Sequence, residues 1–225
     1  MASDRNYVVF FDLDRTLTSM NSGHAIIKAA SDMGLINKKD ITTAIIHTVL
    51  YKTGLRSTYQ MIEGMGNWLK GTRVDLVSAI AREAVELYLV PSLFKQVRDE
   101  IRFHKGMNAH IVILSSAIEE ICIPMAEQLG IDSVLCTKME TTGHTFTGKP
   151  EGAYCFGNEK AARITKHCKE LGLTLSSAYC YADSVSDIPA LSLVGNPVCI
   201  NPDRKLKKHA TRKGWRISDW SPGII

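Results

Sequence analysis

The stretch YVVFFDLDRT, residues 7–16, joins an unbroken apolar run to a pair of carboxylates. Five apolar residues in succession, Tyr7 to Phe11, are typical of a strand that is buried on both faces, as in a parallel sheet. Asp12 and Asp14 follow at once, although two like charges so close repel each other. This spacing indicates either a cation between the two carboxylates or a reaction that gives each one a separate task. The alternative is a loop with two solvated aspartates.

Four further strand-like runs occur at 109–114, 132–136, 177–183 and 196–200. Helix-like patterns separate them at 118–129, 158–171 and 186–193. This alternation predicts an α/β fold, a doubly wound parallel sheet with a Rossmann-like core. Ligands of such sheets bind beyond the carboxyl ends of the strands, where Asp12, Ser115 and Asp183 are expected to lie.

Residues 20–105 interrupt the alternation and show only helical patterns. We therefore expect an inserted all-helical cap of about four helices, which serves either as a lid over the site or as a structural decoration. The predicted division is a catalytic core of residues 1–18 and 106–225, with residues 19–105 forming the cap and its connecting helix.

Local signals mark element ends in and after this insertion. Thr72 and Asp75 have the spacing of a variant capping box, and Ser92, after Pro91, is expected to open another helix. Residues 137–149 alternate around Thr142-Gly143 and predict a small hairpin.

Composition and charge narrow the class of protein. Of the 225 residues, 45% are apolar and 22% charged, which is ordinary for a globular protein that can bury a core without disulfides. The net charge of +4 is mild, and much of it lies in residues 204–215. This segment predicts a solvated amphipathic helix. A patch for nucleic acid or anionic membranes is the alternative, and we expect no nucleic-acid partner.

Cysteine usage and hydropathy indicate the cellular compartment in which the protein is expected. The six cysteines show no C-x-x-C spacing, which favours buried, reduced thiols in a cytoplasmic protein. The N-terminus is short and polar, and no apolar run approaches 18 residues, so we expect neither a signal peptide nor a membrane span. Oligomeric state is left open by these features.

The carboxylates suggest a division of labour. At the exit of a strand, Asp12 can act as an oxygen nucleophile, with a divalent cation offsetting its charge against an anionic substrate. Asp14 can protonate a leaving alkoxide and later activate a water molecule. Asp183 and Asp187 supply further acidic oxygens of the kind that magnesium prefers. Alternatively, Asp187 or Ser186 only caps a helix.

Two other side chains suit a phosphate group. Ser115 can donate its hydroxyl and a neighbouring amide to a phosphate oxygen, whereas a serine in a turn is the plainer reading. Lys160 lies near the start of a predicted helix, where it is either a solvated surface charge or a cation that stabilises spreading negative charge.

Taken in order, D-x-D-x-T, a strand-end serine, a helical lysine and D-x-x-x-D resemble the motifs of the haloacid dehalogenase superfamily of phosphatases. The C-terminal part, from Tyr181 to Trp215, looks like the phosphoserine-phosphatase-like branch, which carries a helical cap after its first motif. The resemblance covers nearly the whole chain. The residues that match the four motifs are Asp12, Asp14 and Thr16; Ser115; Lys160; and Asp183 with Asp187.

The resemblance implies a two-step reaction. Asp12 would attack phosphorus and form an aspartyl-phosphate while Asp14 protonates the leaving oxygen; water activated by Asp14 would then hydrolyse the intermediate. A magnesium ion would be held by Asp12, the backbone carbonyl of Asp14 and Asp183, with Asp187 in support. The phosphate-binding residues would be Ser115, Ser116, Lys160 and Thr16.

The chain departs from phosphoserine phosphatases in its cap. The glutamate that takes the ammonium group of phosphoserine in that branch corresponds to Asn21. The arginine for its carboxylate corresponds to Met65, with Arg56 and Arg73 close by as alternatives. A neutral amide and a thioether do not hold a zwitterion by charge. Asn21, Met65 and Arg56 are therefore the candidate specificity residues, and serine specificity is not carried over.

The predicted function is that of a magnesium-dependent phosphatase acting on a small phosphorylated metabolite. Candidate substrates are histidinol phosphate, another small alcohol phosphate or a lysolipid phosphate. A phosphotransferase that uses the same intermediate, phosphoserine phosphatase proper and a catalytically silent phosphate-binding protein are the alternatives, the last disfavoured by four intact motifs.

Overall fold

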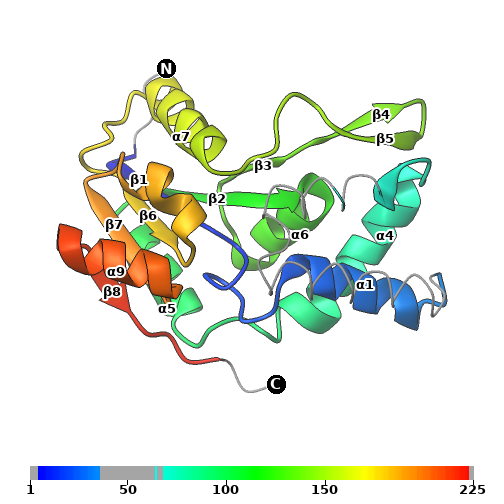
Figure 1. The fold of residues 1–225 in the computed structure, drawn as a ribbon, viewed down its shortest axis with the longest axis horizontal. Helices are drawn as coiled ribbons and strands as arrows, with labels where there is room; N and C mark the ends of the chain where they lie inside the picture. Colours follow the sequence, from blue (N-terminus) through cyan, green and yellow to red (C-terminus); the bar gives the residue numbers. More distant parts are fainter. Residues whose placement is uncertain (1–4, 36–63, 65–67, 223–225) are drawn as a thin grey trace.

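The computed structural model describes residues 5–35, 64 and 68–222. At its centre lies a sheet of six parallel strands in the order β3-β2-β1-β6-β7-β8 (Figure 1). Strand β1 has a neighbour on each side, which explains its continuous apolar run. The strands are β1 (Tyr7–Phe11), β2 (Ala109–Ile118), β3 (Ser133–Thr137), β6 (Tyr179–Ala182), β7 (Asn196–Ile200) and β8 (Arg216–Ser218).

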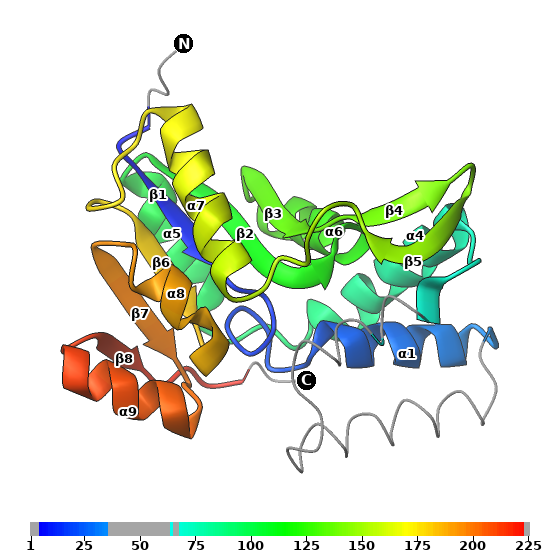
Figure 2. The same ribbon diagram turned by 45° about the horizontal axis from the view of Figure 1, so that its top comes forward.

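Helices cover both faces of this sheet (Figure 2). Val9 and Phe11 of β1 belong to one hydrophobic cluster, which includes residues of α5 (Val97–Gly106), α6 (Glu119–Leu129) and the inserted helices described below. Val8 and Phe10 belong to a second cluster, which includes residues of α7 (Asn158–Leu171), α8 (Ile188–Leu191) and α9 (Arg204–Lys213). The predicted doubly wound architecture is thus confirmed.

The insertion leaves the sheet after β1. Its described elements are α1 (Ser22–Asp32), α4 (Val74–Ala84) and the π-helical turn η1 (Val85–Leu89), which pack against one another. The chain departs and returns along adjacent paths: the N–H of Ser19 donates to the carbonyl of Ser92 at 2.8 Å, and the N–H of Phe94 donates to that of Leu17 at 3.1 Å.

A hairpin of β4 (Met139–Thr142) and β5 (Thr145–Pro150) follows β3, with its turn at the predicted place. Gly143 in that turn has a φ of 60°, which suits glycine. The hairpin projects towards the inserted helices (Figure 1), and the N–H of Val74 donates to the carbonyl of His144 at 3.0 Å. It therefore links the core segment to the start of α4.

One predicted capping box and one predicted helix start are wrong. Helix α4 begins at Val74 with Arg73, rather than Thr72, as its N-cap, and it has no side-chain cap; the Asp75 carboxylate is engaged by the guanidinium of Arg73. Ser92 opens no helix: its hydroxyl donates to the Leu89 carbonyl at 2.9 Å, and α5 begins five residues later.

Two boundaries also differ from expectation. Strand β2 continues past Leu114 through Ser115 to Ile118, with a register shift against β3 in between. The predicted helix at 186–193 is a 3₁₀ turn, Val185–Asp187, followed by the short α8. Strand β8 was not anticipated, since three residues carry little periodic signal.

The basic C-terminal segment forms the predicted amphipathic helix α9, whose Leu206 and Ala210 are buried while most of its basic side chains are exposed. All six cysteines are buried and free, which confirms the expectation of buried thiols without disulfides. No described helix combines the length and apolar character needed to cross a membrane.

Candidate active site

Three carboxylates converge at the carboxyl edge of the sheet. Strand register pairs Phe11 with Tyr181, so Asp12 and Asp183 emerge from neighbouring strands at nearly the same level. Asp187 joins them from the 3₁₀ turn before α8. One oxygen of each carboxylate lies within 4.8 Å of the others. All three side chains are buried, with exposed fractions of 8%, 7% and 2% for Asp12, Asp183 and Asp187.

Lys160 enters this cluster from the first turn of α7. Its ammonium nitrogen lies 3.1 Å from Oδ1 of Asp12 and 2.7 Å from Oδ1 of Asp187. Only 3% of the residue is exposed, so Lys160 is not a solvated surface charge. The glycine before α7, Gly157, has a φ of 56°, a conformation that favours glycine and lets the chain turn into the helix.

Burial is the main cause of the shifted pKa values of Asp12 and Asp183. It raises the pKa of Asp12 to about 7, although Lys160 opposes the shift. It likewise raises the pKa of Asp183 to about 8, with the charges of Asp12 and Asp187 acting in the same direction. Burial alone would lower the pKa of Lys160, but the two carboxylates beside it outweigh burial and hold that pKa well above its usual value.

The donor set of this cluster fits a magnesium ion. Three carboxylates face one ammonium group, so negative charge is left uncompensated when all are ionised. Oδ2 of Asp187 is buried and has no hydrogen-bond partner within the described residues. Buried oxygen ligands with spare lone pairs and excess negative charge are what a small hard cation requires.

Asp14 is not one of the three clustered carboxylates, and its carboxylate is hydrogen-bonded to the start of α1. Its Oδ1 accepts a hydrogen bond from the N–H of Ser22 at 2.7 Å, and its Oδ2 accepts from the Ser22 hydroxyl at 2.9 Å and from Nδ2 of Asn21 at 3.0 Å. Burial raises the pKa of Asp14, and the hydrogen bonds from Ser22 oppose that rise. The two aspartates of the first motif thus occupy different environments.

The predicted phosphate-binding hydroxyls lie beside this edge of the sheet. Oγ of Ser115 accepts the N–H of Ala117 at 3.2 Å, which leaves its own hydrogen for a ligand. The Thr16 hydroxyl is buried and has no partner among the described residues. Ser116 is half-buried, and its carbonyl accepts a hydrogen bond from the Thr137 hydroxyl at 2.9 Å.

Of the three candidate specificity residues, Asn21 alone lies among the described residues. Asn21 is the N-cap of α1, its Oδ1 accepting the N–H of Gly23 at 3.0 Å, and its amide nitrogen is engaged with Asp14. Met65 and Arg56 lie outside the described residues.

Asp203 is a residue of this region that the sequence patterns did not single out. Its N–H donates to the carbonyl of Asp183 at 2.8 Å, and its Oδ2 accepts the N–H of Val185 at 2.7 Å. Its Oδ1 also caps α9, so it ties that helix to the loop that carries Asp183. Asp203 follows a strand, β7, and the strand-end argument applied to Asp12 and Asp183 could have found it.

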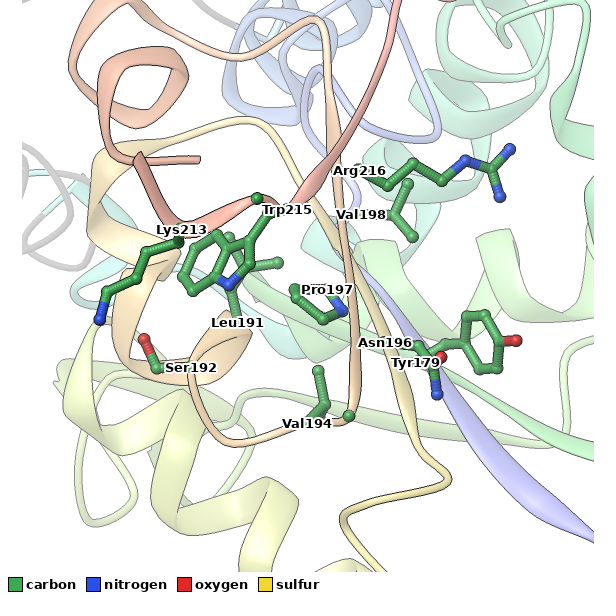
Figure 3. Close-up of a pocket in the computed structure, with 12 residues that line it drawn as sticks. Tyr179, Leu191, Ser192, Val194, Asn196, Pro197, Val198, Lys213, Trp215 and Arg216 are labelled. Atoms are coloured by element: carbon green, nitrogen blue, oxygen red, sulfur yellow. The ribbon is translucent and has the colours of Figure 1, made fainter. Parts of the chain in front are cut away.

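A groove at the opposite end of the sheet is unrelated to this cluster. Figure 3 shows it along the beginnings of β6 and β7, with Trp215, Pro197 and Val194 on its walls. Parallel α/β sheets bind their ligands at the other end of the strands. The acidic cluster, rather than this groove, is therefore the candidate active site.

Comparison with known proteins agrees with the motif order. Residues 9–192 match the family of haloacid dehalogenase-like hydrolases, so the chain belongs to that family. A probable phosphatase of Mycobacterium tuberculosis is 31% identical over 215 residues, which cover 94% of this chain and 75% of that protein. A histidinol-phosphatase of Neisseria meningitidis serogroup C is 29% identical over 216 residues, covering 93% of this chain and 97% of the relative.

The fold also has solved counterparts. A phosphoserine phosphatase, solved as an analogue of its phospho-aspartyl intermediate, superposes with a TM-score of 0.70 at 17% identity and covers 98% of this chain and 95% of its own. The resemblance to this family is thus confirmed, and with it the prediction of an enzyme of the hydrolase class. The phosphatases among its relatives support a phosphomonoesterase.

Proposed function

We propose that this hydrolase is a magnesium-dependent phosphatase that cleaves a small phosphomonoester through an aspartyl-phosphate on Asp12. The observation that carries the proposal is the buried cluster of Asp12, Asp183 and Asp187 around Lys160, at the sheet edge where α/β proteins bind ligands. A buried carboxylate beside a cation and a metal site is a suitable nucleophile for phosphorus.

Each residue has a role in this scheme. Oδ2 of Asp12 is the attacking atom, because Oδ1 already forms an ion pair with Lys160 and accepts a hydrogen bond from the N–H of Leu13 at 2.8 Å. Lys160 stabilises negative charge on the phosphoryl group as the bond to the leaving oxygen breaks. Ser115 and Thr16, with Ser116 beside them, donate hydrogen bonds to the phosphoryl oxygens.

Asp14 handles protons in both steps. It gives a proton to the departing alkoxide and takes one from the water that attacks the aspartyl-phosphate. Magnesium would be held by the carboxylates of Asp12 and Asp183 and the backbone carbonyl of Asp14, with Asp187 in support. When bound, it supplies positive charge that offsets repulsion between the nucleophile and the anionic substrate.

The domain division follows from the same scheme. We propose that residues 1–18 and 106–225 form the catalytic core and that residues 19–105 form the cap and its connecting helix. The hydrogen bonds at Ser19 and Phe94, where the insertion leaves and returns, support a cap that is attached beside the Asp12–Asp14 loop.

The substrate class follows from the Asn21 position and the relatives. Asn21 carries no charge to hold an ammonium group, which argues against phosphoserine. We infer a small alcohol phosphate, and the histidinol-phosphatase among the relatives makes histidinol phosphate a candidate to assay first.

A screen of phosphorylated metabolites with magnesium tests the proposal, with the wild type and Asp12→Asn assayed side by side. Release of inorganic phosphate by the wild type alone is the expected result. Adding acceptor alcohols and analysing the products separates hydrolysis from phosphotransfer, since a transferase would yield a new phosphate ester. No turnover of any phosphomonoester would refute the proposed function.

A further inference from the structure

Helix α1 holds the carboxylate of Asp14 at three points. The donors are Nδ2 of Asn21 and both the N–H and the hydroxyl of Ser22, all within 3.0 Å of a carboxylate oxygen. Ser22 is 4% exposed, so water competes little for these hydrogen bonds. A carboxylate at a helix N-terminus also gains from the helix dipole.

The side chain of Asn21 is itself oriented. Its Oδ1 accepts the N–H of Gly23, as an N-cap does, and this contact turns its amide nitrogen towards Asp14. An amide that caps a helix and donates to a carboxylate is not free to select a substrate. Asn21 thus serves Asp14 rather than the substrate's own charged groups.

The loop that carries Asp14 gains from this support. Arg15, the next residue, has a φ of 60°, a left-handed conformation that is unfavourable for a residue with a side chain. A carboxyl group on such a loop requires external contacts to stay in one orientation. The contacts come from Asn21 and Ser22, at the start of α1.

We propose that Asn21 and Ser22 are positioning residues that fix the Asp14 carboxyl group for proton transfer to the leaving oxygen. The inference rests on the proposed function. It gives the inserted helix α1 a part in the chemistry that is separate from any contact with the substrate.

The contacts also assign the oxygen that transfers the proton. Oδ2 of Asp14 receives two donors, whereas Oδ1 receives one, the backbone N–H of Ser22. The proton therefore resides on the open side of Oδ1. As the P–O bond breaks, its electron pair stays on the leaving oxygen, the Oδ1–H bond breaks, and that proton forms the O–H of the alcohol. The negative charge returns to Asp14, where the three donors stabilise it.

Leaving-group dependence tests this role. An aryl phosphate such as p-nitrophenyl phosphate releases a stable phenolate and needs little help from an acid, whereas β-glycerophosphate releases a basic alkoxide and needs much. The quantity to compare is kcat/KM, which reports the steps up to departure of the alcohol. Asp14→Asn sets the reference, with a large loss on β-glycerophosphate and a small one on the aryl ester.

Two variants perturb the donors without removing Asp14. Ser22→Ala deletes one O–H donor, and Asn21→Asp keeps the helix cap but faces Asp14 with an acceptor. We expect each to lower kcat/KM for β-glycerophosphate by about 10- to 100-fold, with less than about threefold change for p-nitrophenyl phosphate. Ser22→Thr, which restores the hydroxyl, should recover most of the loss. Ser31→Ala, the same truncation further along α1, should leave both substrates unaffected.

The outcomes are distinct. Equal losses on both substrates would show a merely structural role and overturn the inference, as would unchanged kcat/KM in Ser22→Ala and Asn21→Asp. In both cases an active wild type and an inactive Asp12→Asn variant would leave the proposed function standing. A wild type that hydrolyses neither these two esters nor any phosphomonoester of the metabolite screen would refute the proposed function, and the inference with it.

Discussion

The ammonium nitrogen of Lys160 lies 3.1 Å from Oδ1 of Asp12, and both residues are buried. Neither charge would be favourable there alone, since desolvation penalises each ionised form. Held together, they place a carboxylate with a free oxygen and a cation at one point of the sheet edge. The proposed chemistry depends on this pair.

Replacing Lys160 by methionine, which keeps the length of the side chain, should therefore impair catalysis. The pKa of Asp12, already raised to about 7 by burial, should rise further without the opposing cation, and phosphoryl charge would lose a partner. We expect kcat/KM for p-nitrophenyl phosphate at pH 7 to fall by about 100-fold or more.

Lys166→Met is the matched control on the same helix. Lys166 is exposed and lies 3.9 Å from Glu170, a surface pair that contributes little. Its kcat/KM should stay within about twofold of wild type. If Lys160→Met retained a similar kcat/KM, Lys160 would have no part in the reaction.

The raised pKa values of Asp12 and Asp183 predict how stability depends on pH without metal. Both values, about 7 and about 8, exceed the unfolded value of 3.8, so the folded protein binds more protons than the unfolded chain between about pH 4 and pH 8. The free energy of unfolding should then fall as pH rises through this interval. Calorimetry in EDTA from pH 5 to 8.5 measures the effect.

Comparing the wild type with Asp183→Asn separates the pH dependence of Tm that comes from the acidic cluster from the pH dependence that comes from other groups. Between pH 5 and 8.5 the wild-type Tm should fall about 5 °C further than that of the variant. Added magnesium should raise the wild-type Tm most at the alkaline end, where the carboxylates are ionised. A Tm difference between the two proteins that does not change with pH would contradict the account.

The two acids of the last motif should contribute unequally to metal affinity. Oδ1 of Asp187 is engaged with Lys160, whereas the carboxylate of Asp183 accepts no hydrogen bond from the described residues. Asp183→Asn should therefore weaken magnesium binding at least about tenfold, and Asp187→Asn should weaken it less. Isothermal titration calorimetry on the two variants gives both constants without any assay of turnover; the reverse order would refute this assignment.

Much of the fold could be predicted because β1 is central. Burial on both faces demands the continuous apolar run Tyr7–Phe11, and the alternation of later strands and helices then implies the parallel sheet. The contact between Lys160 and Asp187, and their position near Asp12, could be predicted only through the motif order. Lys160 and Asp187 are 27 residues apart in the sequence, and periodicity carries no information on such contacts.

The misplaced elements depended on side-chain choices that a pattern does not contain. The Asp75 carboxylate could either cap α4 or form an ion pair with Arg73, and in the structure it forms the ion pair. The resemblance makes Asn21 a predicted specificity residue because it corresponds to the family's cap glutamate. An asparagine before a helical pattern, with Ser22 following, is also an N-cap signal, which could have indicated its contact with Asp14.

Phosphoserine should be a poor substrate. The amide of Asn21 is engaged with Asp14 and offers no charge to an ammonium group, and a missing charged partner in a desolvated site costs about 2–5 kcal/mol. This corresponds to a kcat/KM roughly 30- to several-thousand-fold lower than for a well-matched ester. Assays of L-phosphoserine beside histidinol phosphate and β-glycerophosphate measure this difference in kcat/KM. Phosphoserine as the best substrate would show that a cap residue such as Arg56 supplies the charge.

The covalent role of Asp12 is tested most directly by trapping the phosphorylated enzyme. The wild type is mixed with ³²P-labelled substrate and magnesium, quenched in acid within milliseconds, and digested for mass spectrometry. We expect one acyl phosphate, labile to hydroxylamine, on Asp12, and neither label nor turnover in a folded Asp12→Asn variant. Label on another residue, or near-normal turnover by Asp12→Asn, would contradict the account.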